Sequence, residues 1–244
     1  MARIEKLHPI EHKTISLEKK QVERPKKEIP EYAHTDLNKL PHYAILPARS
    51  PMLAGQKALE QFKAQFGEIK SPTYLAQIIK HREKEGASSE EIEELTNLKY
   101  KYHKGITALR NEMDSYGVTE NSTYCILLRS YLKDHEANLN CGECSSLLKD
   151  ILNRKGIDAQ NIYFYTTNAD GQRVNKAEHV FTVINLAPDA FISDPSTWGE
   201  DAIVCDAWAD ICMKTPDALN FYRNFFLLED KHNMYFEHAD AFCD

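Results

Sequence analysis

Cys141 is the residue whose surroundings in the sequence best fit a nucleophile. It lies in the stretch Asn138-Leu-Asn-Cys141-Gly-Glu143-Cys-Ser-Ser-Leu-Leu. Asn140, followed three residues later by Glu143, fits the capping box that opens a helix. Cys141 is therefore predicted at the first helical position, where unpaired backbone N–H groups and the positive end of the helix dipole favour a thiolate. The thiolate is the form of cysteine that attacks carbonyl carbon.

Other uses of the same stretch stay open. Cys141 and Cys144 make one Cys-x-x-Cys pair, which also fits half of a zinc site or a redox pair. A zinc ribbon needs a second close pair, whereas Cys205 and Cys212 are seven residues apart. Cys144 also falls on an apolar stripe, where a buried cysteine packs as a small hydrophobic residue. The pattern favours a nucleophile, with no metal and no cofactor.

A cysteine nucleophile needs a general base and a group that orients this base. Among ten histidines, His179 stands out because it is predicted to open an apolar strand after the polar run 172–178. Asp194 and Asp206 are the acids considered for orienting it. Asp194 precedes a proline and also fits the start of a turn. Asp206 ends a predicted buried strand, where an unpaired carboxylate is costly, so it is favoured.

Helices are predicted before and around Cys141. Apolar residues recur every three or four positions, and Ser, Pro and Gly mark the starts and stops. Gly105 interrupts the longest of these patterns. The predicted helices cover about 55–66, 72–86, 89–113, 122–134 and 141–156.

Strands are predicted only after Gly156. They cover 161–167, 179–184 and 202–206, and a final helix opens at Thr215-Pro216. Helices first and strands afterwards indicate an α+β fold. We expect residues 1–50 to be a flexible or irregular extension, and 51–244 a single domain with a helical part (51–135) and a core (136–244).

Composition excludes several classes of protein. The net charge of −7 argues against non-specific nucleic-acid binding. No apolar run approaches the length of a membrane span, and the first residues lack the apolar stretch of a signal peptide. Six irregularly spaced cysteines do not form a disulfide framework, so free thiols in a reducing compartment are expected. Residues 1–30 are polar and rich in Lys and Glu, and we expect them to be loosely attached.

Taken in order, the candidate residues resemble a known pattern. The resemblance covers about residues 138–210 and is carried by four segments: Asn140-Cys-Gly-Glu143, His179-Val-Phe-Thr-Val-Ile184, Asp194-Pro-Ser-Thr-Trp-Gly199 and Ile203-Val-Cys-Asp206-Ala-Trp208-Ala. The set resembles the papain-like and transglutaminase-like cysteine hydrolases among bacterial secreted effectors. That pattern usually has Pro-Trp after the last acid, where this chain has Ala207-Trp208. The transglutaminase pattern has an aspartate about fifteen residues after the histidine, which keeps Asp194 in consideration.

The resemblance implies a core with an antiparallel sheet packed on the nucleophile helix. It implies a Cys141–His179–Asp206 triad that works through an acyl-enzyme as a glutamine deamidase, a thiol protease or a transglutaminase. The expected partner is a host protein, reached by secretion from the bacterial cytoplasm without a cleavable signal peptide. A catalytically inactive binding protein on the same fold is the alternative.

Overall fold

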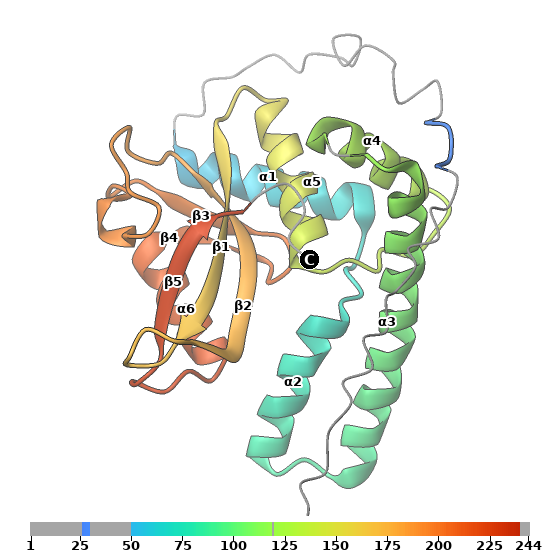
Figure 1. Cartoon of the computed structure of the whole chain (residues 1–244), viewed down its shortest axis with the longest axis horizontal. Helices are drawn as coiled ribbons and strands as arrows, with labels where there is room; N and C mark the ends of the chain where they lie inside the picture. The colour runs from blue at the N-terminus through green and yellow to red at the C-terminus, as the bar shows by residue number, and fades with distance from the viewer. Residues whose placement is uncertain (1–25, 30–49, 119, 240–244) are drawn as a thin grey trace, which may run out of the picture.

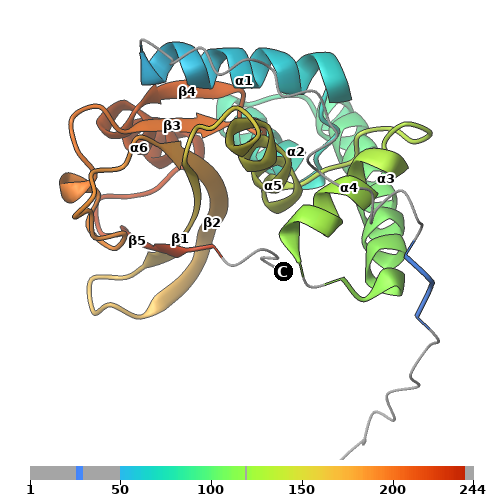
Figure 2. The ribbon, with the colours of Figure 1, turned by 90° about the horizontal axis from the view of Figure 1, so that it is seen from above.

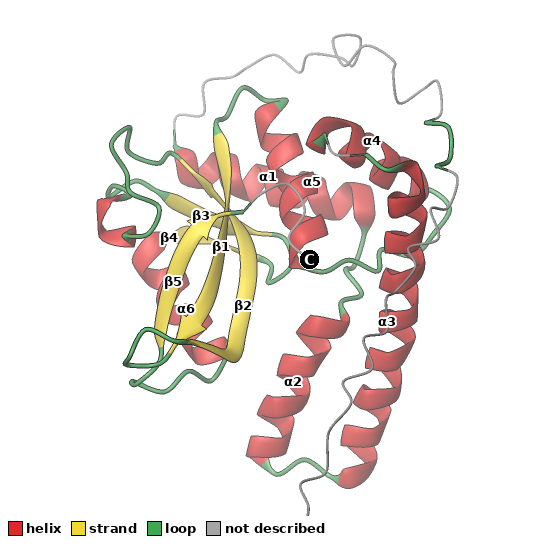
Figure 3. Ribbon diagram, in the orientation of Figure 1, coloured by secondary structure: helices red, strands yellow, loops and turns green. Residues whose placement is uncertain are grey.

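The computed structural model describes residues 26–29, 50–118 and 120–239, with helices first and an antiparallel sheet afterwards (Figures 1 and 3). Its α-helices are α1 (Pro51–Phe66), α2 (Pro72–Glu85), α3 (Ser89–Tyr116), α4 (Asn121–Tyr131), α5 (Cys141–Asn153) and α6 (Thr215–Phe225). Its strands are β1 (Ala159–Thr167), β2 (Arg173–Ile184), β3 (Ile203–Asp206), β4 (Ile211–Lys214) and β5 (Asn233–His238). The predicted α+β class is confirmed.

The helix signals in the sequence work as expected. The side chain of Ser71 caps α2 by accepting a hydrogen bond from Tyr74 N, and Ser88 caps α3 through Glu91 N. Gly86 ends α2 in the left-handed conformation that glycine adopts without strain. α2 and α3 then lie side by side as a long helical hairpin that runs beside the sheet (Figure 1).

α3 runs through Gly105 without a break. A Cβ atom at Gly105 would lie only 2.3 Å from Cγ of Asn138, so a larger residue would displace that side chain. Glycine at this position leaves room for a side chain of the segment that leads into α5. The helical half of the chain therefore fixes the approach to Cys141.

The five strands in the described part form one antiparallel sheet in the order β4-β3-β2-β1-β5. Within β2, only the residues Thr182–Ile184 pair with β3. The preceding residues of β2, including His179, extend past the end of β3. This open stretch of β2 is where the sheet meets the start of α5.

Helices cover both faces of the sheet. α5 packs on one face, where Ser145 Oγ donates to Val180 O, and α1 crosses the same face over β3 and β4 (Figure 2). α6 packs on the other face, where Tyr222 lies among the rings of Phe164 and Phe181. The core therefore lies between each helix layer and the sheet.

The structure corrects the start of the second strand. β2 begins at Arg173, so His179 lies inside the strand and does not open it. The polar run 172–178 was expected to precede the strand. Residues 173–178 instead extend the hairpin with β1, where Glu178 accepts hydrogen bonds from Tyr163 and Arg173. β4 and β5 were not predicted.

Part of the segment expected to be loosely attached contacts α3. Lys27 N donates to Ser115 O at 2.7 Å, its Nζ lies 2.7 Å from Glu112 Oε2, and Ile29 packs against the core. The expectations for residues 1–25 and for the irregular segment 30–49 fall outside the described residues.

Candidate active site

Cys141 occupies the first position of α5, as predicted. The capping box is present, and Asn140 N donates to Glu143 Oε2 at 3.0 Å. No described residue accepts a hydrogen bond from the N–H of Cys141 itself. That group and the positive end of the helix therefore remain available beside the half-buried thiol.

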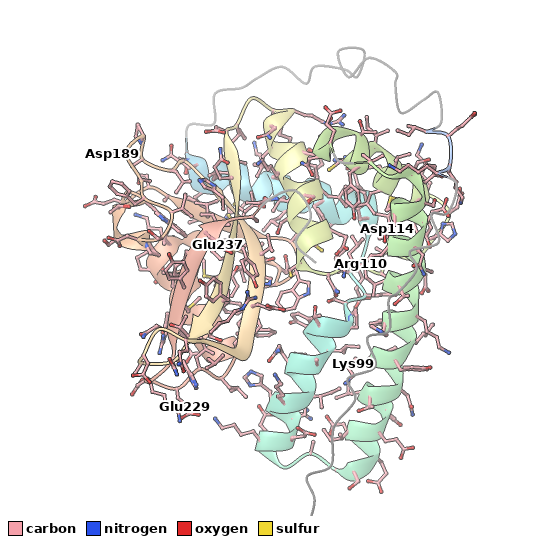
Figure 4. All side chains as sticks on the ribbon, viewed as in Figure 1. Lys99, Arg110, Asp114, Asp189, Glu229 and Glu237 are labelled. Atoms are coloured by element: carbon pink, nitrogen blue, oxygen red, sulfur yellow. The ribbon has the colours of Figure 1, made fainter. Side chains whose placement is uncertain are left out.

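Arg110 places a positive charge beside this helix start. Its Nε donates to Glu143 Oε1 at 2.8 Å, so the guanidinium extends from α3 toward the N-terminal end of α5 (Figure 4). Burial opposes its charge, but the carboxylate of Glu143, with a smaller contribution from Cys141, raises the pKa of Arg110. Arg110 thus neutralises the capping carboxylate, which would otherwise repel a thiolate.

His179 is buried, with its side chain 1% exposed, and one edge of its ring is occupied. Its Nε2 lies 2.6 Å from Oδ2 of Asp206. Its Nδ1 is buried and has no hydrogen-bond partner among the described residues. Since Asp206 accepts from Nε2, Nδ1 is the nitrogen left to exchange a proton with the thiol of Cys141.

Asp206 is a fully engaged buried carboxylate. Its Oδ1 accepts from the backbone N–H groups of Trp208 (2.9 Å) and Ala209 (3.2 Å). Its Oδ2 accepts from His179 and from the hydroxyl of Tyr222 at 2.8 Å. The carboxylate is therefore held from two sides in one orientation.

Asp194 lies elsewhere and has a structural role. It is exposed and accepts hydrogen bonds from the backbone N and the hydroxyl of Ser196, at the start of a short 3-10 helix, Pro195–Thr197. The structure thus brings Asp206, and not Asp194, to His179, and Asp194 starts a turn.

Burial and Asp206 act in opposite directions on the pKa of His179. Burial on its own lowers the pKa of His179. The charge of Asp206, its hydrogen bond and a weaker contribution from Cys141 together raise this pKa to about 9. The imidazolium form is thus favoured at neutral pH, which suits a histidine that pairs with a thiolate.

Two aromatic residues complete the surroundings of His179. Trp208 lies with its ring centroid 4.5 Å from that of His179 and shields the ring from water. Tyr222 lies in the final helix that the sequence predicted, but nothing in the pattern of that helix distinguishes it. Its hydroxyl is invisible to a pattern search, because its partner lies on a strand 16 residues earlier.

A hydrogen-bond chain links the histidine side of the site to the cysteine side. Trp208 Nε1 donates to Ser71 Oγ at 2.7 Å, and Ser71 Oγ donates to Asn140 Oδ1 at 3.0 Å. Thr73 Oγ1 donates to the same oxygen of Asn140. Ser71, at the start of α2, therefore links Trp208, which covers His179, to Asn140, which caps the helix that carries Cys141.

Cys144 does not share the environment of Cys141. It is completely buried in the core, and burial raises the pKa of its thiol well above the usual range. Within residues 26–29, 50–118 and 120–239, no three His, Cys, Asp or Glu side chains are arranged to hold a metal ion. None of the helices described for this chain combines the length and apolarity needed to cross a bilayer.

Comparisons with known proteins leave the site to be judged on its geometry. No protein-family model matches the chain, and neither curated proteins nor solved structures gave a significant match.

Proposed function

We propose that this protein is a thiol-dependent acyl hydrolase with Cys141 as nucleophile, His179 as general base and Asp206 as the residue that orients the base. The observation that carries the proposal is the state of the His179 ring. One nitrogen is bound to a buried carboxylate at 2.6 Å, and the other is unpaired on the side that interacts with Cys141.

The first half of the reaction follows from these positions. The Cys141 thiolate attacks the carbonyl carbon of a carboxamide or peptide, and the carbonyl oxygen becomes an oxyanion. The free N–H of Cys141 at the start of α5 donates to that oxyanion. His179 Nδ1 then gives its proton to the leaving nitrogen, the C–N bond breaks, and ammonia or an amine departs from the thioester.

The second half reverses the roles. Neutral His179 takes a proton from water at Nδ1, the resulting hydroxide attacks the thioester carbonyl, and the C–S bond breaks to restore the thiolate. Throughout, Asp206 keeps the ring in one tautomer and stabilises its positive charge. Deamidation, proteolysis and transglutamination share this acyl-enzyme and differ in the leaving group and the acceptor.

The papain-like or transglutaminase-like class fits this arrangement, because a helix that starts with the cysteine packs on an antiparallel sheet that carries the histidine and the aspartate. On that basis we propose a secreted bacterial effector that deamidates or cleaves a host protein. A transglutaminase would use the same three residues with an amine as acceptor.

The proposal is tested by incubating eukaryotic cell lysate with the purified full chain and with Cys141→Ala, followed by peptide mass spectrometry. An amide converted to an acid, a new N-terminus or a new crosslink should appear only with the unaltered chain. Each of these products identifies one reaction.

Asp194→Asn is the matched control, because it changes the same functional group at an exposed turn. It should retain the activity. If neither the unaltered chain nor this control changes any lysate protein, and Cys141 reacts with iodoacetamide no faster than the buried cysteines, the alternative of an inactive binding protein is favoured.

A further inference from the structure

A second pair of thiols lies outside the Cys141 site. Cys205 on β3 and Cys212 on β4 stand directly opposite each other in the antiparallel ladder, and their Sγ atoms are 3.6 Å apart. Both are free thiols in the structure. The proposed acyl chemistry uses neither of them.

α1 is shaped to accommodate this pair. A Cβ atom on Gly55 would lie 2.4 Å from Sγ of Cys205 and 2.6 Å from Sγ of Cys212. A glycine inside a helix costs about 0.5–1 kcal/mol relative to alanine, so this position sacrifices helix stability to make room for both sulfur atoms. The same contact keeps the two thiols together under α1.

The two thiols differ in access. Cys205 is completely buried, whereas Cys212 is partly exposed and also lies 3.8 Å from Sδ of Met52. A reagent from solvent therefore reaches Cys212 first, with Cys205 behind it.

We propose that Cys205 and Cys212 form a reversible dithiol–disulfide pair, an oxidation site separate from Cys141. Directly opposed residues of an antiparallel ladder have Cα atoms roughly 4.5–5.5 Å apart, within the range of about 4.4–6.8 Å that a disulfide accepts. The sulfur atoms need to approach by only about 1.6 Å to reach bonding distance, which side-chain rotation supplies.

Hydrogen peroxide is the oxidant of the proposed step. The Cys212 thiolate attacks one peroxide oxygen, the O–O bond breaks, and protonation of the departing hydroxide gives water and a sulfenic acid on Cys212. The Cys205 sulfur, after losing its proton, attacks the Cys212 sulfur. The S–O bond breaks and a second water leaves. In total, two thiols lose two protons and two electrons, and one peroxide is reduced to two waters.

The electrostatics support this order of attack. The hydrogen bond from Cys205 lowers the pKa of Cys212, while the same contact and burial raise the pKa of Cys205. Cys212 is thus the thiol that ionises first and the one that reacts with peroxide. Cys205 is held against it as the resolving thiol.

The disulfide would close a ring that includes Asp206 and Trp208. It would tie the end of β3 to β4 and constrain the segment that carries the carboxylate bound to His179. Oxidation should therefore raise the melting temperature, by on the order of 5 °C, and dithiothreitol should reverse this change.

The test uses full-length Cys141→Ala protein, so that the proposed nucleophile does not consume the oxidant. After peroxide treatment and alkylation of the remaining thiols, non-reducing peptide mapping should recover a linked peptide pair that contains Cys205 and Cys212. In Cys205→Ser, Cys212 should instead accumulate as a sulfenic acid that dimedone traps. In Cys212→Ser, Cys205 should remain a thiol.

The proposal is overturned if both thiols stay alkylatable after treatment with a large excess of peroxide. It is also overturned if Cys212 links to another cysteine in preference to Cys205, or if it is oxidised to sulfinic acid without linking. Circular dichroism melts of each serine variant establish that the protein is folded in these comparisons. None of these results depends on the acyl hydrolase activity.

Discussion

Replacing Asp206 with asparagine should isolate the contribution of the carboxylate that orients His179, because the other residues of the site stay unchanged. The carboxylate accepts four hydrogen bonds, two on each oxygen. An amide has one oxygen to accept with, and its nitrogen only donates. Whichever way it faces, two donors meet the amide nitrogen in place of an acceptor. Each donor that does not re-form a bond by accepting costs about 1–3 kcal/mol, so Asp206→Asn should lose up to about 6 kcal/mol of stability.

The orientation that keeps the bonds from Trp208 and Ala209 places the amide nitrogen against Nε2 of His179. Nε2 must then accept a hydrogen bond from the amide, so the ring proton moves to Nδ1. A protonated Nδ1 in a neutral ring cannot take the proton of Cys141. In serine proteases the equivalent change lowers kcat by ~10⁴. A cysteine–histidine pair that rests as thiolate and imidazolium should lose less, on the order of 10–10³.

The assay is turnover of the lysate substrate, or of a peptide derived from it, well below the melting temperature of each variant. Asp194→Asn is the control, and we expect less than about a tenfold effect, because an amide oxygen still caps the turn. The reasoning is refuted if folded Asp206→Asn retains activity within a few-fold of the unaltered chain, or if Asp194→Asn is the more damaging change.

Three further predictions concern neighbouring groups. Tyr222→Phe removes one donor from the buried carboxylate and should lower the free energy of unfolding by about 1–3 kcal/mol in urea melts; an unchanged midpoint would contradict this. Cys141 should react with iodoacetamide faster than Cys144 at neutral pH, measured by peptide mapping over time, and equal rates would count against the nucleophile. In Cys141→Ala, which leaves His179 and Asp206 in place, stability should be highest below pH 6.5 and fall as the pH rises toward about 9, because His179 of the folded protein retains a proton that the unfolded chain releases. Urea midpoints that rise over this interval would contradict the last prediction.

The sequence predicted the parts of the site that local chemistry determines. Cys141 follows an N-cap residue and precedes a capping acid, and these signals act within four residues, so the helix start was readable. Asp206 was preferred over Asp194 because a carboxylate at the end of a buried strand needs a partner, and the structure supplies four donors. Burial could be inferred from the apolar strand that precedes Asp206.

What the sequence could not supply depends on contacts between distant segments. Tyr222 looks like any apolar position on a helix until β3 is placed beside it. β4 has four residues and β5 lies at the sheet edge with most of its side chains exposed, so neither carries a clear apolar pattern. Gly105 appeared to weaken a helix, and its purpose emerges only from the position of Asn138.

The position of α1 affects the order in which parts of this protein fold during synthesis. Met52 O accepts a hydrogen bond from a thiol 160 residues later, and Lys63 pairs with Asp210 across 147 residues. During synthesis, the strands that α1 covers emerge long after α1 itself, and contacts of such separation form slowly. A nascent chain that stops before Asp206 already has the helix that carries Cys141. It lacks the complete strands β3 and β4, on which α1 packs, and the carboxylate that binds His179. The thiol of Cys141 is thus joined by His179 and its carboxylate partner only after Asp206 has been made.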